Sequence, residues 1–361
     1  MSDIFQRKRD HIELAARGPV VGADHGGMFD EVTLVHQALP ELAMGQIDLS
    51  ARLLDSPLRA PLMVTGMTGG PPETQALNAG LARLCQDLGV AFGVGSQRII
   101  TKDAATAASF QVRQAAPDVV LLGNIGVMQA RAMGPAGVAE LMKVIGADYM
   151  AVHLNPAQEL AQKGVDADRD FRGGVDAIAR LVDALDGRVL VKECGTGLST
   201  QAVARLHAVG VRAVDVSGSG GTSWVKVEAL RADGPLRDLG MLFQGWGIPT
   251  AAAVVGAAGL GPQVVASGGI DDPLKAAKAL ALGADVAGCA RPVLQAWLAD
   301  GEAGARRYLE TMIHGLRMAL ALTGSPSVAA LRRAPRVVGP RLRAWIDQAS
   351  SPLNTDPSSH E

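Results

Sequence analysis

The sequence predicts an α/β fold, a (β/α)8 TIM barrel with an N-terminal extension. Eight short aliphatic runs recur along the chain, and Ala- and Leu-rich segments with a helical period lie between them. Runs that are apolar throughout suit parallel strands buried on both faces. Eight strand–helix units are what a (β/α)8 barrel requires. A doubly wound open sheet is the structural alternative, and its five or six strands fit the pattern less well.

The expected strands are marked by where each aliphatic run starts. They begin near Pro61, Val90, Val119, Asp148, Val189, Val211, Gln263 and Asp285. The clearest helical segments between them span residues 73–88, 136–145, 200–208 and 273–282. Several runs are entered through a Gly-containing turn, where glycine can end a helix in the left-handed conformation and let the chain enter the next strand.

Three segments lie outside the repeated units. Residues 1–58 form an N-terminal extension that we expect to pack on the barrel mouth, with a basic helical stretch and a strand-like segment at 29–36. The barrel itself is expected over 59–349, and the polar tail 350–361 is expected to be disordered. Residues 218–247 form a long loop after the sixth strand, and such loops are commonly lids or binding elements.

Composition excludes several classes of protein. The 361 residues are 48% hydrophobic and carry a net charge of −2, so no global positive field draws the chain to nucleic acid or to an anionic membrane. The apolar stretch 250–260 is too short to cross a bilayer. The N-terminus carries charge where a signal peptide is apolar, and three distant cysteines form no disulfide framework. We therefore expect a cytoplasmic protein.

The polar residues of this aliphatic chain gather directly after the expected strands. In a (β/α)8 barrel these positions form the rim of the active site. The eight segments span residues 65–70, 93–98, 123–126, 153–159, 192–195, 217–224, 267–271 and 289–292. This coincidence predicts one site at the C-terminal ends of the strands.

The last two rim segments predict a phosphate site. Ser-Gly-Gly-Ile at 267–270 precedes a helix, and Ala290 and Arg291 begin another. Unpaired N–H groups and the helix dipole favour a phosphate there, and loops after strands seven and eight bind phosphate in many barrels. Taken alone, a Gly-Gly pair would be an ordinary turn.

Lys192 ends a buried aliphatic strand, so its ammonium must face the cavity and find a negative partner. It could form a structural salt bridge, serve as a Schiff-base amine, or lie as a cation beside a bound anionic ring. The residues alone leave these three roles open.

Residues 153–159 place one carboxylate, Glu159, among amide and imidazole groups. This set suits one Mg²⁺ shared with substrate phosphate oxygens, and does not suit zinc. A helix-capping role for Glu159 is the alternative. The basic residues 7–9 are either a solvated helix face or a clamp for a second phosphorylated ligand. Trp224 either packs within the long loop or contacts ligand.

The chain closely resembles type 2 isopentenyl-diphosphate isomerase over roughly residues 5 to 325. The motifs that carry the resemblance include residues 7–11 (Arg-Lys-x-Asp-His), 95–98 (Gly-Ser-Gln-Arg), 153–159 (His-Leu-Asn-Pro-x-Gln-Glu), 220–224 (Gly-Gly-Thr-Ser-Trp) and 267–270. The chain departs from the family at Thr65-Gly66, Cys194 and Thr196, near the expected flavin edge.

The resemblance implies FMN, Mg²⁺ and NADPH, with interconversion of isopentenyl and dimethylallyl diphosphate by a homo-oligomer, a tetramer or octamer. The residues it assigns to FMN are Met67, Thr68, Gly69, Ser96, Asn124, Lys192, Ser217, Thr222, Gly268, Gly269, Ile270, Ala290 and Arg291. Those it assigns to substrate are Arg7, Lys8, His11, Ser96, Gln97, Arg98, Asn155 and Gln158, with Glu159 on the metal. His153, Gln158 and Lys192 would be catalytic.

In the implied chemistry, reduced flavin acts as acid and base without net redox change, and Lys192 favours its anionic form. NADPH is then needed only to reduce the flavin, so no Rossmann fingerprint is required. Two other functions stay open: an FMN-dependent dehydrogenase or oxidase, which would not need the basic clamp or Glu159, and a non-catalytic flavoprotein.

Overall fold

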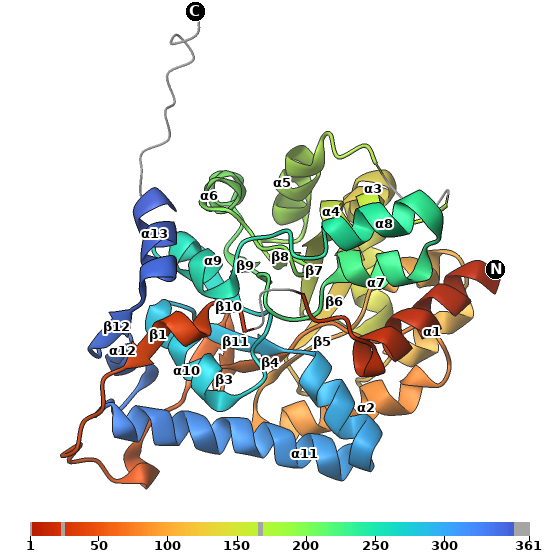
Figure 1. Ribbon diagram of the computed structural model, residues 1–361. Coiled ribbons are helices and arrows are strands. Elements are labelled where there is room, and N and C mark those ends of the chain that lie inside the picture. Colours follow the sequence, from red (N-terminus) through yellow and green to blue (C-terminus); the bar gives the residue numbers. More distant parts are fainter. Residues whose placement is uncertain (1, 23–25, 165–168, 350–361) are drawn as a thin grey trace, which may run out of the picture.

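The computed structural model describes residues 2–22, 26–164 and 169–349. Eight parallel strands close into a barrel in the order β4-β5-β6-β7-β8-β9-β10-β11, with β11 paired to β4. The closed ring confirms the predicted (β/α)8 fold and rules out the open sheet. Figure 1 shows the strands at the centre and helices around them.

The barrel strands lie where the aliphatic runs predicted them. They are β4 (Leu62–Val64), β5 (Ala91–Gly93), β6 (Leu121–Gly126), β7 (Tyr149–Leu154), β8 (Val189–Glu193), β9 (Ala213–Asp215), β10 (Gln263–Ala266) and β11 (Val286–Cys289). The main helices that follow them are α2 (Thr74–Leu88), α3 (Val127–Ile145), α5 (Gly174–Ala184), α6 (Thr200–Ala208), α9 (Thr250–Ala257), α10 (Pro273–Leu282) and α11 (Arg291–Leu322).

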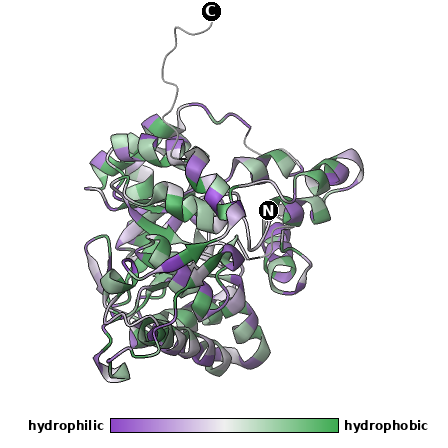
Figure 2. Ribbon diagram, turned by 60° about the vertical axis from the view of Figure 1, so that its left-hand side comes forward, coloured by the Kyte–Doolittle hydropathy of each residue, from purple (hydrophilic) through white to green (hydrophobic). Residues whose placement is uncertain are grey.

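The core lies in two layers. A large cluster fills the space between the strands and the helices, and a smaller one fills the barrel interior, with Met63, Leu122, Leu190 and Val265 among its members. Figure 2 shows hydrophobic residues along the central strands and mixed colours on the helices. Gly89 and Gly146 end α2 and α3 with left-handed φ values of 67° and 65°, as the Gly-containing turns predicted.

The N-terminal extension contributes to both ends of the barrel. The helix α1 (Ser2–Arg17) lies at the mouth, where Lys8 Nζ donates to the carbonyls of Gly69 and Ser96. The hairpin β2 (Ala51–Leu53) and β3 (Ser56–Leu58) closes the opposite end, because Leu53, Leu54 and Leu58 belong to the interior cluster. Only part of residues 1–58 therefore packs on the mouth, and the expectation for the whole segment was wrong.

The strand-like segment near residue 30 and the chain's end pack together. Here η1 (Phe29–Glu31) leads into β1 (Val32–Leu34), which pairs antiparallel with β12 (Arg336–Val338). The short η2 (Met44–Gln46) and the helices α12 (Val328–Leu331) and α13 (Pro340–Ala349) lie outside the barrel repeat, whereas the 3₁₀ helices η3 (Gln97–Thr101) and η4 (Ala104–Phe110) follow β5 and pack on each other. The tail 350–361 lies outside the described residues.

The long segment after β9 folds into two helices, α7 (Trp224–Arg231) and α8 (Gly234–Leu242). Ser223 caps α7, because its Oγ accepts from the Lys226 N–H. A short α4 (Pro156–Ala161) follows β7 and contacts both helices. The expectation of one long loop was therefore wrong, and Figure 1 shows α7, α8 and α1 gathered on one side of the mouth. Among the described residues, no helix is both long and apolar enough to cross a membrane.

Candidate active site at the barrel mouth

A cavity of about 840 Å³ opens at the C-terminal ends of the strands. Segments that end or follow all eight barrel strands contribute to its wall, together with α1. Its volume lies in the upper part of the range of about 300–1,000 Å³ typical of ligand pockets. The predicted site residues that line it are Arg7, Lys8, His11, Met67, Thr68, Gly69, Ser96, Arg98, Asn124, His153, Asn155, Gln158, Glu159, Lys192, Ser217, Thr222, Gly268, Gly269, Ile270, Ala290 and Arg291.

Gln97 is the exception among the predicted residues. Its side chain is fully buried beneath the cavity, where Nε2 donates to the Leu141 carbonyl and Oε1 accepts from the Asn124 N–H. Both ends of the amide are therefore bonded to backbone, and the expectation that Gln97 binds substrate was wrong. Its role is to hold the loop that presents Ser96 and Arg98.

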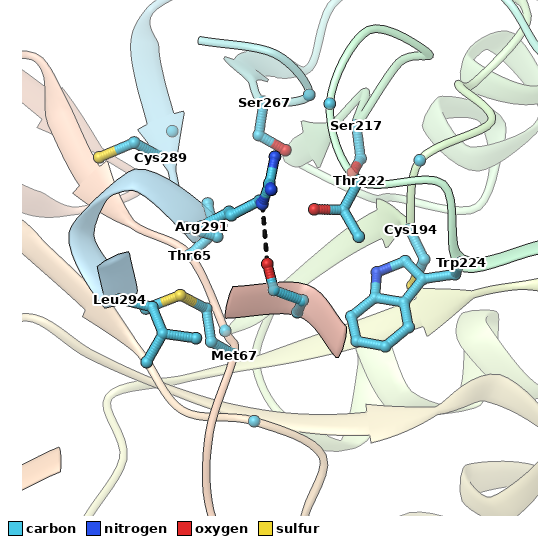
Figure 3. Close-up of a pocket in the computed structure, with 18 of the residues that line it drawn as sticks. Thr65, Met67, Cys194, Ser217, Thr222, Trp224, Ser267, Cys289, Arg291 and Leu294 are labelled. Atoms are coloured by element: carbon cyan, nitrogen blue, oxygen red, sulfur yellow. Dashed lines mark hydrogen bonds between the residues drawn. The ribbon is translucent and has the colours of Figure 1, made fainter. Parts of the chain in front are cut away.

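One end of the cavity is a cradle of glycines. A Cβ on Gly268 would lie 2.1 Å from the Gly218 carbonyl oxygen, and one on Gly269 would lie 2.5 Å from that of Gly220. The two loops therefore pack backbone against backbone. Arg291 begins α11 beside them, and its Nε donates to the Ala15 carbonyl at 2.7 Å, the dashed line in Figure 3. The guanidinium is thus tied to α1, and the helix end itself is left to attract an anion.

Lys192 lies deep in the same cavity. It is only 8% exposed, its Nζ donates to the Glu193 carbonyl, and the Asp215 carboxylate lies 3.9 Å away. Burial lowers the pKa of Lys192, whereas Cys194, then Asp215 and Glu193, raise it, and the net pKa lies above its usual value. The side chain is therefore a buried ammonium facing the cavity.

His153, on β7, lines the wall of the cavity, and its imidazole is neutral. Its Nδ1 lies 2.8 Å from Asn124 Oδ1, which can only accept, so Nδ1 carries the proton. Burial, followed by the charges of Lys192, Arg98 and Lys8, lowers the pKa of His153 to about 3. In this geometry His153 holds Asn124 rather than supplying a positive charge.

Another part of the cavity wall combines cations with one carboxylate. Arg7, Lys8 and Arg98 line it, as does the buried Glu159, which accepts from Asn155 Nδ2 at 3.1 Å. No group of three or more His, Cys, Asp or Glu side chains suited to a metal occurs within the described ranges. Glu159 is therefore a single protein ligand, the number that suits a Mg²⁺ held jointly with phosphate oxygens.

Glu228 on α7 is a site residue that the sequence reasoning missed. It is 1% exposed, and its carboxylate accepts from His11 Nε2 at 2.9 Å, Gln158 Nε2 at 3.0 Å and Arg231 at 2.8 Å. It thus joins α1, α4 and α7 behind the cavity wall. The signal available in the sequence was a single glutamate between the apolar residues Val227 and Ala229.

These bonds set the charge of Glu228. Burial alone would raise its pKa, but hydrogen bonds from His11 and Gln158 and the charge of Arg231 lower the pKa to about 2. The carboxylate therefore stays ionised.

Trp224 begins α7, lines the cavity, and meets the His11 ring edge-on at 5.1 Å between centroids. Figure 3 shows its indole at the cavity wall.

The depressed pKa predicts an acid-sensitive contribution to stability. Because the pKa of Glu228 falls from 4.5 to about 2 on folding, the carboxylate stabilises the fold above pH 4.5 and loses this effect as the pH falls towards 2. At about 1.4 kcal/mol per pKa unit, the effect is roughly 3 kcal/mol. Urea unfolding should show a gap between wild type and Glu228→Gln that narrows from pH 7 to pH 3.5. A gap that is constant with pH would contradict this.

Comparison with known proteins adds sequence relatives. The FMN-dependent dehydrogenase family matches residues 150–337. A protein of Xanthobacter autotrophicus named isopentenyl-diphosphate delta-isomerase is 43% identical over 334 residues, which is 91% of this chain and 96% of that protein. One of the same name from Aeropyrum pernix is 40% identical over 347 residues, covering 94% and 92% of the two chains.

Solved structures share the fold at low sequence identity. A lactate oxidase of Pediococcus acidilactici has a TM-score of 0.65 at 13% identity and covers 93% of this chain and 94% of its own. A flavocytochrome b2 variant has a TM-score of 0.64 at 18% identity, covering 86% and 76%. At such identities the likeness extends to the barrel alone.

Proposed function

Because the chain belongs to the isopentenyl-diphosphate delta-isomerase family, we propose that it interconverts isopentenyl and dimethylallyl diphosphate with FMN bound in the barrel mouth. The observation that carries the proposal is the division of one cavity. The glycine cradle follows β9 and β10, whereas Arg7, Lys8, Arg98 and the buried Glu159 lie on α1, η3 and α4, with Lys192 on β8 between the two sets. An isomerase that holds a flavin against a diphosphate needs both sets.

The residues present fit FMN. Its phosphate would lie on the cradle of Gly268 and Gly269 and at the start of α11, where no Cβ intrudes and the helix dipole favours an anion. Lys192 would lie beside the ring as the positive charge that an anionic flavin requires. Of the roles left open for Lys192, the raised pKa disfavours a Schiff-base amine, which needs a neutral nitrogen.

When bound and reduced, FMN supplies a group that can give and take a proton, which is what an allylic rearrangement without net redox change requires. The chain's own residues bind and orient the alkene. Arg7, Lys8 and Arg98 would neutralise the diphosphate, and Glu159 would be the protein ligand of Mg²⁺. Gln158 would face the reacting carbons while Glu228 fixes its amide.

Leaving out one component of the assay at a time tests this proposal. We expect anaerobic enzyme with FMN, Mg²⁺ and NADPH to convert isopentenyl diphosphate, and the conversion to fail when FMN or Mg²⁺ is left out. NADPH should be needed in trace amounts only, since the reaction consumes no electrons. Holoenzyme that binds FMN but oxidises NADPH continuously with an electron acceptor, without isomerising, would instead support the dehydrogenase alternative.

We further propose a cytoplasmic homo-oligomer, a tetramer or octamer. The free thiols of Cys85, Cys194 and Cys289 support a reducing compartment. Self-association is supported by an apolar strip on and after α8, formed by Leu239, Leu242, Phe243 and Trp246, which are 51%, 80%, 47% and 65% exposed. Light scattering should give a multiple of 37.3 kDa for wild type and a smaller mass for Leu242→Asp. Equal masses would argue against this strip as the interface.

A further inference from the structure

Strand register places three side chains in one row across the barrel. Lys192 on β8 is paired with His153 on β7 and with Asp215 on β9. His153 is neutral, so the carboxyl group of Asp215 is the acidic neighbour in the row; burial raises its pKa, while Lys192 and hydrogen bonds from Ser267 and Ser217 act against this rise. Asp215 is 1% exposed and is absent from the cavity wall, where Lys192 stands in front of it.

One oxygen of Asp215 organises two rim loops. Its Oδ1 accepts from the Ser217 N–H at 3.1 Å and from Ser267 Oγ at 2.6 Å. Ser217 has a φ of 39°, a left-handed conformation that costs a non-glycine residue energy and needs support. Figure 3 shows both serines at the edge of the cavity. This oxygen therefore ties the loop after β9 to the loop that begins the glycine cradle.

The other oxygen is unpaired. Asp215 Oδ2 is buried and has no hydrogen-bond partner among the residues that the structure describes, and Lys192 Nζ lies 3.9 Å from it. Burying a carboxylate oxygen without a hydrogen-bond donor costs free energy. The attraction of the nearby Lys192 ammonium accounts for the position of this oxygen. The separation is too long for a hydrogen bond, so apart from the N–H that donates to the Glu193 carbonyl, the N–H groups of Lys192 are not used by Asp215 and can face the cavity.

We propose that Asp215 is a positioning residue for Lys192, which fixes the ammonium at the cavity wall and offsets part of its charge, and so sets how strongly the site prefers reduced over oxidised FMN. The inference rests on the proposed FMN site. Two-electron reduction adds negative charge to the flavin ring, and a cation beside the ring favours that state in proportion to its uncompensated charge.

The test is the midpoint potential of FMN in the holoenzyme at pH 6, for wild type and Asp215→Asn. Asparagine keeps an oxygen for Ser217 and Ser267 but removes the charge that faces Lys192. We expect the preference for reduced over oxidised FMN to rise about tenfold, a shift of about +30 mV for a two-electron couple. Asp285→Asn is the matched control, because Asp285 also accepts from a barrel backbone N–H, that of Val264, but at the opposite end.

A second background shows whether Asp215 acts through Lys192. In Lys192→Met the buried carboxylate loses its cation and should take up a proton, so adding Asp215→Asn should leave the potential unchanged. An unchanged or lowered potential in Asp215→Asn alone would overturn the proposal, as would equal shifts in the two backgrounds. Failure to bind FMN in wild type would instead overturn the proposed function.

Discussion

Alanine at Gln158 is expected to lower kcat at least 100-fold while FMN stays bound. The Gln158 amide bridges two groups: Nε2 donates to Glu228 at 3.0 Å and Oε1 accepts from Asn155 Nδ2 at 3.2 Å. Both partners are held by the fold, so the amide is fixed at the cavity wall before substrate arrives. Misplacement of a reacting group by a lost positioning residue costs about 10² in rate.

A second variant separates the role of Gln158 from that of Glu228, which holds its amide. Glu228→Gln should lower kcat less than Gln158→Ala, since the new amide oxygen at position 228 can still accept from Gln158. FMN affinity, measured by the fluorescence of free and bound FMN, should be the same for both variants and wild type. Gln201→Ala, on the exposed face of α6, is the control for a simple glutamine loss. If Gln158→Ala turned over at the wild-type rate, the assignment of the substrate end of the cavity would be wrong.

Alanine at Gly268 is expected to weaken FMN binding about 100-fold, which corresponds to about 2.8 kcal/mol. Gly268 has a φ of 101°, and its added Cβ would lie 2.1 Å from the Gly218 carbonyl oxygen and 2.9 Å from the Gly218 nitrogen. Both neighbours are backbone atoms that cannot rotate away. The two loops must therefore separate, and the cradle for the phosphate opens.

A matched glycine separates this effect from backbone strain. Gly259 also has a positive φ, of 81°, but nothing lies within 4 Å of its added Cβ. Gly259→Ala should therefore lose some stability and keep its FMN affinity, as measured by titration of the apoprotein. Equal loss of FMN affinity in the two variants would show that strain, rather than closure of the cradle, controls binding.

The barrel could be predicted because its signals are local and repeated. Each strand is a short apolar run, and the glycines that end α2 and α3 stand in the sequence where a left-handed residue is needed. The rim residues follow from the same pattern, since parallel strands bring their C-terminal ends to one face. With the exception of Gln97, the site residues predicted from this rule therefore line one cavity.

The errors concern contacts that no local pattern encodes. Gln97 lies between Ser96 and Arg98, which line the cavity, and only the folded structure shows that its amide bonds to the backbone of Leu141 and Asn124. In the sequence the hairpin of β2 and β3 belongs to the N-terminal extension. In the structure it lies at the end of the barrel opposite the mouth, where the Leu54 N–H donates to Gln263 Oε1. The role of Glu228 is visible only in the folded structure, where its carboxylate joins α1, α4 and α7.

The helices α7 and α8 were missed for a physical reason. Glycine and serine are frequent from residue 217 to 223, and glycine and proline from 233 to 249, which is typical of loops. The helix α7 lies between these two segments and α8 lies within the second; they are eight and nine residues long, which is short for an isolated helix. Their stability comes from packing on each other and on α1 and α4.

The most direct test of the central claim is the fate of solvent hydrogen. Isopentenyl diphosphate is incubated anaerobically in D2O with the holoenzyme, Mg²⁺ and NADPH, and the product is followed by NMR. The account predicts dimethylallyl diphosphate that carries deuterium and forms only after the flavin is reduced. Protein that binds and reduces FMN but yields no such product would contradict the isomerase assignment while leaving the barrel and its flavin site in place.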